Sequence, residues 1–226
     1  MPDSSRDPVF QPFDPGADVE RSSRFMPHWF QSGITVFITF RTADSLSKKV
    51  LELWHRELLD WLRRRDLPTE LAFGPERLDE LDQAHRNEFQ KLRKQIWQRH
   101  LDDCHGACVL KQPELAKEVA QSLQHFDGER YDLDSFVVMP NHVHVLVQFR
   151  PPTTMRQQLT SWLRFSAKQI NQRLGQKGVF WQSEPFDHLV RSAEQFEYLQ
   201  RYIAENPKKA KLKVGEFLYW SRDMRE

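Results

Sequence analysis

The stretch YDLDSFVVMPNHVHVLVQF, residues 131–149, decides how this chain folds. Its two halves are rich in β-branched and aromatic side chains and alternate in polarity, a pattern that favours strands. Pro140 and Asn141 separate the halves by a connection short enough for a tight hairpin. The sequence therefore predicts two antiparallel strands, over residues 131–139 and 142–149.

The second of these strands carries two histidines, His142 and His144. Successive strand residues point to opposite faces, so both imidazoles lie on one face, about 7 Å apart along the strand. At that spacing they can converge on one divalent cation. Val143 and Val145 then form the opposite, apolar face, which packs against helices. Two surface or hydrogen-bonded histidines are the alternative, and a His-x-His by itself favours that alternative.

Helix and strand patterns alternate on both sides of the hairpin. Apolar side chains at steps of three and four residues predict helices, and β-branched runs predict strands. We expect a strand over 34–40, helices over 45–65 and 75–101 and from 113, a helix over 155–174, a strand-like stretch over 179–190, and a helix over 193–205 that Pro207 ends. This order predicts an α+β fold with an antiparallel sheet of the split β-α-β type. The extra helices form an insertion in the first crossover, at about residues 44–126.

The N-terminal segment differs in composition from the rest of the chain. Residues 1–24 contain four prolines and five acidic side chains with little periodicity, and we expect a flexible acidic tail. Residues 25–226 are then a single domain. The start of the chain has neither a basic nor an apolar segment of the signal-peptide type, and the longest apolar runs are of strand length, so we expect a cytoplasmic protein without a membrane partner.

Composition excludes several function classes. The chain has 226 residues but only 8 glycines, and no glycine pattern fits a P-loop or a Rossmann dinucleotide site. The two cysteines, Cys104 and Cys108, do not form a disulfide framework, and we expect them to be reduced. Together with His100 and His105 they give a zinc site as a weak alternative, because a single C-x₃-C lacks a second pair of ligands.

Two polar residues stand out on the last predicted helix. Tyr202 and Asn206 are four positions apart and share one helix face. Beside a bound metal ion, they would supply a nucleophile and a further ligand. Spacing alone favours a packing tyrosine and an asparagine that caps the helix before Pro207.

Several motifs in this order resemble the REP-associated tyrosine transposases, which are IS200-like, single-tyrosine members of the HUH nucleases. The motifs are Met139–Val147, Phe180–Gln182, Phe186–His188 and Tyr202–Ala210, preceded by His28-Trp29-Phe30 and Gly33. The resemblance extends from about Pro27 to Trp220. Lys211 stands where that family usually has glycine, and Pro185 stands where an aromatic residue is common.

The resemblance implies a fold, a site and a reaction. The fold is a ferredoxin-like antiparallel sheet, the HUH nuclease core, with the helical insertion described above. His142, His144 and Asn206 correspond to the metal-binding residues, with Mg²⁺ or Mn²⁺ as the ion, and Tyr202 corresponds to the nucleophile. The implied activity is cleavage and transfer of single-stranded DNA at hairpin or palindromic elements through a 5′-phosphotyrosine. A non-catalytic DNA-hairpin-binding protein and a metal phosphodiesterase that uses water are the alternatives.

The expected partner is single-stranded or hairpin DNA, which implies a nucleoid-associated protein, either a monomer or a homodimer. The candidate DNA contacts are His188, Arg191, Lys208, Lys209, Trp181 and Arg164. The formal net charge of +1 does not contradict this partner, because charge is unevenly distributed. Residues 151–213 hold 11 basic and 5 acidic side chains, a net charge of +6. Affinity for phosphate depends on this local charge.

Overall fold

The computed structural model describes residues 10–23, 27–45, 48–72, 78, 81–102, 106–183 and 185–224. The chain forms two compact units, one of Met1–Ala43 with Cys108–Glu226 and one of Asp44–Ala107. The first unit contains the sheet and the candidate site. The second is helical and interrupts the first crossover, between β3 (Thr35–Arg41) and β4 (Tyr131–Val138). It is shorter than the predicted insertion at 44–126, because the helix that begins at Pro113 packs in the first unit.

A five-stranded antiparallel sheet forms the centre of the first unit. Its spatial order is β6 (Phe186–Leu189), β3 (Thr35–Arg41), β5 (His142–Phe149), β4 (Tyr131–Val138) and β7 (Leu218–Ser221). The first four strands have the order of a ferredoxin-like fold, and β7 extends the sheet beside β4. The predicted α+β class and the predicted hairpin are confirmed.

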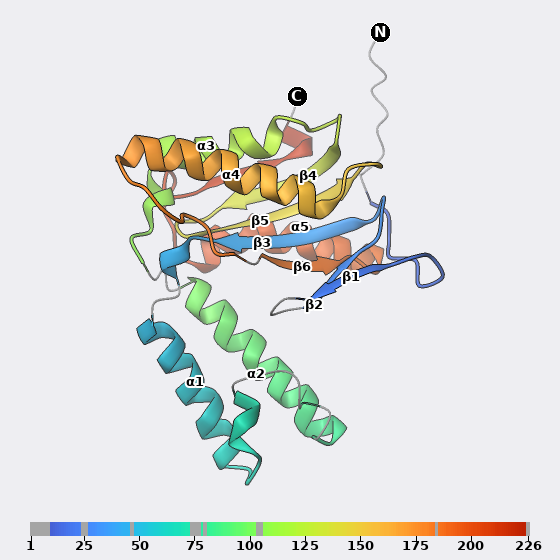
Figure 1. The fold of residues 1–226 in the computed structure, drawn as a ribbon, viewed down its shortest axis with the longest axis vertical. Coiled ribbons are helices and arrows are strands. Elements are labelled where there is room, and N and C mark those ends of the chain that lie inside the picture. Colours follow the sequence, from blue (N-terminus) through green and yellow to red (C-terminus); the bar gives the residue numbers. More distant parts are fainter. Residues whose placement is uncertain are drawn as a thin grey trace. The chain divides into compact units, whose positions relative to one another are not determined.

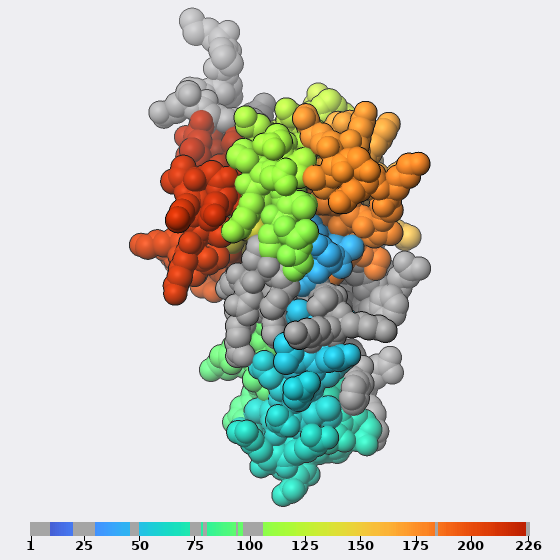
Figure 2. Space-filling view, turned by 90° about the vertical axis from the view of Figure 1, so that its left-hand side faces the viewer, coloured from blue at the N-terminus to red at the C-terminus, as the bar shows by residue number. Residues whose placement is uncertain are grey.

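Helices cover both faces of this sheet (Figure 1). On one face, α3 (Pro113–Gln124) and α4 (Met155–Leu174) lie side by side (Figures 1 and 2). They pack on alternate strand residues such as Val36, Val143 and Val145. On the other face, α5 (Ala193–Lys209) packs on the intervening residues, Phe37 and Leu146 among them. Because successive side chains of a strand point to opposite faces, the sheet separates two apolar cores. Among the described helices, none combines the length and apolarity that a bilayer crossing requires.

The last helix is longer than predicted. We expected it to end at Glu205 because Pro207 follows, but α5 continues through Pro207 to Lys209. A proline lacks the N–H that an interior helix position donates, and this removes only one hydrogen bond in the last turn. The backbone N–H of Ala210 still donates to the carbonyl of Asn206, at 3.0 Å. Asn206 is thus a residue within the helix.

The N-terminal segment is partly structured, which differs from the predicted flexible tail over 1–24. The N–H of Phe13 donates to the carbonyl of Val190, and Phe10 packs on Phe196 with ring centroids 4.9 Å apart. Further along, β1 (Glu20–Ser23) pairs with β2 (Pro27–Phe30). The prediction is wrong for residues 10–23, while residues 1–9 and 24 lie outside the described part of the chain.

The second unit consists of α1 (Lys48–Arg63), α2 (Gln83–Asp102) and short helical turns between them. Both helices were predicted, although α2 starts later than expected. Their apolar stripes share one small core, which contains Leu58, Leu62, Leu71, Phe89 and Ile96. This unit therefore buries its own apolar surface.

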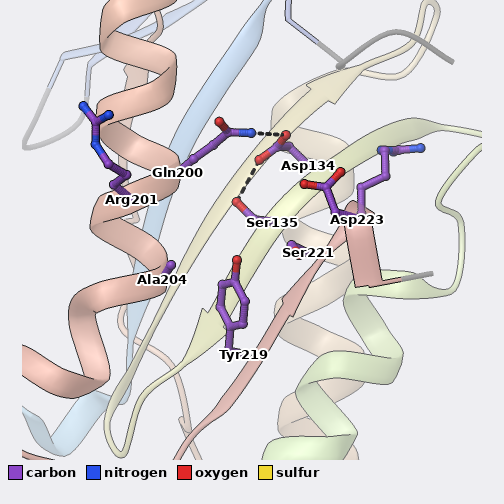
Figure 3. A pocket seen from close by; sticks show the side chains of 9 residues that line it. Asp134, Ser135, Gln200, Arg201, Ala204, Tyr219, Ser221 and Asp223 are labelled. Carbon is purple, nitrogen blue, oxygen red and sulfur yellow. Dashed lines mark hydrogen bonds between the residues drawn. The ribbon is translucent and has the colours of Figure 1, made fainter. Parts of the chain in front are cut away.

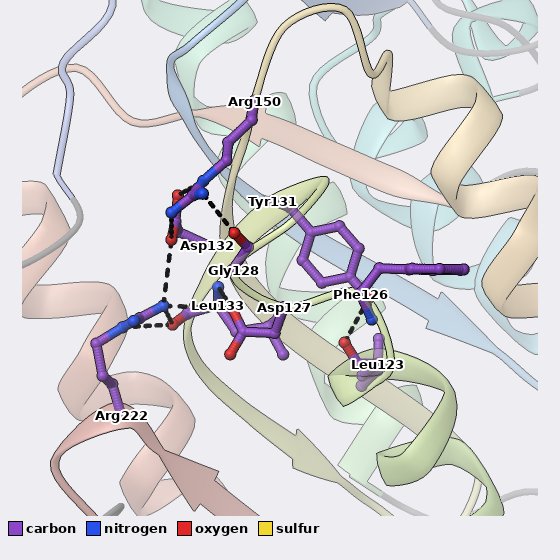
Figure 4. Close-up of polar contacts among 9 residues, drawn as sticks. All are labelled: Leu123, Phe126, Asp127, Gly128, Tyr131, Asp132, Leu133, Arg150 and Arg222. Atoms are coloured by element: carbon purple, nitrogen blue, oxygen red, sulfur yellow. Dashed lines mark hydrogen bonds and ion pairs between the residues drawn. The ribbon is translucent and has the colours of Figure 1, made fainter. Parts of the chain in front are cut away.

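A charged network ties the carboxyl end of β5 to the start of β4 and to the C-terminal turn (Figure 4). It consists of Asp127, Asp132, Arg150 and Arg222. Arg150 pairs with Asp132 through Nε and Oδ2 at 2.5 Å, and Arg222 pairs with Asp127 at 3.4 Å and donates to the carbonyl of Leu133. Asp127 also accepts from the N–H of Leu133, at 2.8 Å. Each charge in this network has a partner of opposite charge.

Candidate active site

His142 and His144 both point from β5 toward the side of the sheet that α5 covers. Their ring centroids are 4.7 Å apart, and the two residues are only 1% and 2% exposed. His144 packs face to face on Phe37, which belongs to the α5 core. The predicted shared face is present. The alternative of two surface histidines is wrong, because both rings are buried.

One nitrogen of each imidazole has a hydrogen-bond partner and the other does not. His142 Nδ1 lies 2.8 Å from Asn141 Oδ1, and His144 Nδ1 lies 2.7 Å from Thr39 Oγ1. The amide oxygen of Asn141 only accepts, so His142 Nδ1 carries the proton and Nε2 keeps its lone pair. Both Nε2 atoms are buried and have no hydrogen-bond partner among the described residues.

Asn206 supplies a third unsatisfied atom. Its side chain is 2% exposed, and its Oδ1 is buried without a partner in the described part of the chain. The alternative of a helix cap is wrong, because α5 continues to Lys209. We call His142, His144 and Asn206 the ligand trio.

Tyr202 lies beside the two histidines, one turn before Asn206 on α5. Its half-buried ring is 5.2 Å from the His144 ring and 6.0 Å from the Phe37 ring, centroid to centroid. Lys209 Nζ is 5.5 Å from the centre of the same ring. The helix thus brings the predicted nucleophile against a predicted metal ligand.

Burial keeps both imidazoles neutral. It lowers the pKa of His144 to about 3, and the positive charge of Arg41 adds to the effect. Burial also lowers the pKa of His142 well below its usual value, followed by the effects of His144 and Arg41. Neutral imidazole is the form that binds a metal ion.

Sequence reasoning missed three residues around the histidines, namely Thr39, Arg41 and Asn141. Thr39 and Arg41 are on β3, directly opposite His144 and His142 in the antiparallel register. Alternation along residues 34–40 would have placed Thr39 on the Phe37 face, but the register between β3 and β5 is not visible in the sequence. Asn141 was assigned only to the turn.

The donor atoms of the ligand trio are of the kinds that bind a metal ion. A buried polar atom without a partner costs about 1–3 kcal/mol, and such atoms are rare in folded proteins. Here three of them, two imidazole nitrogens and one amide oxygen, occur on facing elements. In the described chain no group of three or more His, Cys, Asp or Glu side chains could hold an ion. A metal site at the two histidines would therefore need the amide oxygen of Asn206 as its third protein ligand.

The predicted DNA contacts on and near α5 are mostly at the surface. Lys208 and Arg191 are exposed, and Lys209 pairs with Glu205 at 3.2 Å while remaining half exposed. His188 is half-buried on β6, and its Nε2 lies 2.6 Å from Gln195 Nε2. These four predictions remain compatible with a strand of DNA that passes α5.

The other two predicted contacts lie elsewhere. Trp181 is 4% exposed, packs on Phe40 and donates from Nε1 to Ser166 Oγ at 3.0 Å, so its side chain lies in the core of the described structure. Arg164 is exposed, but on α4, which covers the opposite face of the sheet from Tyr202. Trp181 is part of the core because β-branched and aromatic residues around it form the larger apolar cluster.

A pocket of about 220 Å³ lies on the other flank of α5, between that helix, β4 and β7 (Figure 3). Asp134 lines it and accepts hydrogen bonds from Ser135 Oγ and Gln200 Nε2, both at 2.8 Å. Burial raises the pKa of Asp134 above its usual value, and the two hydrogen bonds act against the shift. The hydroxyl of Tyr219 points into the pocket from β7 (Figure 3). The sequence patterns gave no sign of this pocket.

The cysteines do not support a zinc site. Cys108 is disulfide-bonded, which differs from the expected reduced thiol and leaves no thiolate there for zinc. Cys104 and His105 lie outside the described residues, as does the side chain of His100.

The fold and the site define a class of protein, in which a ferredoxin-like antiparallel sheet presents a His-x-His strand to a helix with a tyrosine. Residues 108–206 match the family model described as "Transposase IS200 like". This segment contains the ligand trio and Tyr202. The resemblance that the sequence motifs indicated is therefore confirmed, and over this segment the chain is similar to IS200-like transposases.

One solved structure that the comparison matched to this chain is described as "Structure of the REP associates tyrosine transposase bound to a REP hairpin". It is 14% identical, with a TM-score of 0.38, over 83% of this chain and 74% of that chain. No curated protein matches the chain.

Proposed function

We propose that this protein cleaves and rejoins single-stranded DNA at hairpin or palindromic elements, with Mg²⁺ or Mn²⁺ and through a 5′-phosphotyrosine on Tyr202. One observation carries the proposal: the three polar atoms of the ligand trio are buried without partners among the described residues, and His144 lies next to the Tyr202 ring. Buried polar atoms that lack a protein partner are expected where a bound ligand forms the missing interaction. The match to IS200-like transposases supports the same reaction class.

The ligand trio would hold the ion through His142 Nε2, His144 Nε2 and Asn206 Oδ1. When bound, the ion would supply Lewis-acid stabilisation of charge on the phosphoryl oxygens. Mg²⁺ and Mn²⁺ prefer oxygen ligands, so water and substrate oxygens would complete the coordination. Thr39 and Asn141 hold the imidazole rings through Nδ1, which fixes the direction of each Nε2.

Tyr202 performs the covalent step. Its phenolic oxygen attacks the phosphorus of a phosphodiester, the bond from phosphorus to the 3′ oxygen breaks, and the phenol gives up its proton. The leaving 3′ oxygen takes up one proton, so the products are a 3′-OH end and a 5′-phosphotyrosine. The reverse reaction with another 3′-OH rejoins DNA without a nucleotide cofactor, because the covalent link keeps the bond energy.

The basic side chains around α5 would bind the DNA backbone. Lys208, Lys209 and Arg191 are exposed there, and such contacts contribute affinity without sequence preference. His188 lies on the face of the sheet that α5 covers, since its register partner on β3 is Phe37, which packs on that face. Folded DNA elements would then be distinguished by their shape and by unpaired nucleotides.

The test is a covalent adduct assay. The full chain is incubated with Mn²⁺ and a labelled single-stranded hairpin, and protein-linked label is measured after denaturation. We expect an adduct with the native protein and none with Tyr202→Phe. Tyr198→Phe is the matched control, because Tyr198 is on the same helix, with its ring 6.3 Å from Tyr202, and is 52% exposed.

Three results would contradict the proposal. An adduct that survives in Tyr202→Phe and disappears in Tyr198→Phe would assign the nucleophile to Tyr198. Cleavage without any adduct would favour a phosphodiesterase that uses water. Hairpin binding without cleavage, in both Mg²⁺ and Mn²⁺, would favour a non-catalytic hairpin-binding protein.

A further inference from the structure

The pocket between α5, β4 and β7 has a buried carboxylate in its wall (Figure 3). Asp134 is 6% exposed, and its two carboxylate oxygens accept from Gln200 Nε2 and from Ser135 Oγ, each at 2.8 Å. An ionised carboxylate has about four acceptor positions, so about two remain for a ligand. Because burial of an incompletely bonded charge costs stability, packing alone gives no reason for an aspartate at this position.

A β-bulge in β4 directs Asp134 into this pocket. Leu133 pairs with Val147 of β5 and Ser135 pairs with Leu146, which leaves Asp134 as an extra residue in the ladder. Asp134 and Ser135 therefore both line the pocket beside α5 although they are consecutive, while Leu133 lies in the core under α3 and α4. Bulges commonly re-aim a side chain next to a functional site. The irregularity thus gives the pocket two successive polar side chains from one strand.

The rest of the wall supplies hydrogen-bond donors and limits the size of a ligand. The Tyr219 hydroxyl points into the pocket from β7 (Figure 3), and the exposed Arg201 of α5 lines the same pocket. The volume of about 220 Å³ is below the about 300–1,000 Å³ of pockets for drug-sized ligands. The pocket therefore suits one small planar group that offers donors to Asp134 and an acceptor to Tyr219.

Guanine has this arrangement of hydrogen-bonding groups. An ionised carboxylate only accepts, so it binds best to two adjacent donors. Unpaired bases are commonly read through their Watson–Crick edge, where guanine has two adjacent donors, the N1–H and the N2 amino group, beside the O6 acceptor. Thymine has a single N–H between two carbonyl oxygens, and adenine and cytosine have a ring acceptor beside the amino group. These other bases would set a lone pair against the carboxylate of Asp134.

Helix α5 places this pocket close to Tyr202. Gln200 and Ala204, one turn apart, line the pocket. Tyr202 lies midway between them, and because two residues turn a helix by about 200°, it faces the other flank, where it packs beside His144. A helix with its side chains is about 10–12 Å across, and stacked nucleotides rise about 3.4 Å each. A DNA strand that crosses α5 at Tyr202 would therefore reach the pocket within about four nucleotides.

We propose that this pocket binds the base of an unpaired guanine in single-stranded DNA. Asp134 accepts hydrogen bonds from the N1–H and the N2 amino group of the base, and the Tyr219 hydroxyl donates to its O6 oxygen. Arg201, at the surface of α5, contacts the phosphate of the same nucleotide. The inference rests on the proposed function in taking DNA that crosses α5 as the source of the base.

The experiment measures hairpin binding by the Tyr202→Phe protein, which cannot form the adduct. Fluorescence anisotropy gives the Kd for DNA hairpins with a single-stranded flank, 5′ or 3′, made of thymidine alone or of thymidine with one guanine at each position in turn. We expect one guanine position to bind at least about 5-fold more tightly than thymidine alone, the lower end for a good bidentate base contact. That position should lie within about four nucleotides of the phosphate that the native protein cleaves. Hypoxanthine there lacks only the N2 amino group and should lose most of the gain.

Substitutions in the pocket separate base recognition from general DNA binding. Asp134→Asn turns one acceptor oxygen into a donor and should abolish the guanine gain, while the Kd for the thymidine flank stays nearly the same. Tyr219→Phe removes only the hydroxyl and should reduce the gain in part. Glu197→Gln is the matched control, because Glu197 is an exposed carboxylate of α5 outside the pocket, and it should keep the full gain.

Several results would overturn the inference. Equal binding of all flanks is one, and a folded Asp134→Asn protein that keeps the guanine gain is another. Hypoxanthine that binds as tightly as guanine would also overturn it, and this arm needs no substitution in the pocket. If dGMP competes as well as the oligonucleotide, the pocket takes a free nucleotide and DNA is not the source. In each case an intact adduct reaction would leave the proposed function standing, whereas absence of both hairpin binding and adduct would contradict both.

Discussion

Strand β5 has a cluster of polar groups at each end, and the two clusters differ in how their hydrogen bonds and charges are satisfied. At its start, the ligand trio contains three buried atoms that lack partners among the described residues. At its end, the charged network of Asp127, Asp132, Arg150 and Arg222 is paired throughout (Figure 4). Both clusters lie on the same sheet and are built from ordinary side chains.

The difference separates scaffold from site. A paired network holds chain segments together, and loss of one partner leaves an uncompensated charge. The ligand trio makes a poor contribution to stability, because its unpaired atoms have lost water without gaining a partner. Removal of one member should therefore cost function and leave stability nearly unchanged. The following predictions test this contrast, from the largest expected effect to the smallest.

His144→Leu should lower the rate of adduct formation by more than about 100-fold, since even loss of an outer partner of a metal ligand costs about 10- to 100-fold. The melting temperature should change little, because removal of the unpaired buried Nε2 offsets the lost hydrogen bond with Thr39, and the apolar side chain is of similar size. Adduct assays and thermal unfolding measure the two effects on the same sample. A large loss of stability would show that His144 belongs to the scaffold.

Arg222→Met should lower the free energy of unfolding by about 3 kcal/mol, the scale for breaking a buried ion pair. The side chain of Asp127 is 0% exposed and that of Asp132 is 11% exposed, so both charges stay buried after the change. Denaturant titration measures the loss. The folded fraction should still form the adduct, and a protein that is stable yet inactive would contradict the comparison.

Asp134→Asn should raise stability at neutral pH. Burial raises the pKa of Asp134, so the native state binds more protons than the unfolded state in the window between the unfolded value, about 3.9, and the raised value. The native protein is therefore favoured below that window and loses this contribution as pH rises through it. The variant should match the parent at pH 3 and exceed it at pH 7 in denaturant titrations. A constant difference at all pH values would contradict the assignment.

Lys211→Gly should raise stability by up to about 1 kcal/mol, because an L-residue in the left-handed region costs about 1–2 kcal/mol and glycine gives back part of that as backbone entropy. Lys211 has φ +55° just after α5. Lys213→Gly is the matched control, because Lys213 is exposed and is not among the described residues with positive φ. The control should lose stability or stay the same. Neither change should alter adduct formation.

Much of the site follows from local pattern. A period of two places His142 and His144 on one face, and helical spacing places Tyr202 and Asn206 on another. Both expectations agree with β5 and α5 as observed. An aromatic residue in a strand pattern looks the same whether it lies in the core or on the surface, and only the structure places Trp181 in the core.

The sequence by itself indicated the strands β3, β4 and β5, the long helices, the faces on which His142, His144, Tyr202 and Asn206 lie, and the family that the motifs resemble. Only the tertiary structure decided that β3 pairs with β5 in the register that sets Arg41 opposite His142, and that α5 covers the histidine face. The physical reason is that periodicity depends on the backbone of one segment. Register and burial, in contrast, arise from packing between segments far apart in the chain. The unpaired atoms of the ligand trio and the charge beside them become visible only after that packing is known.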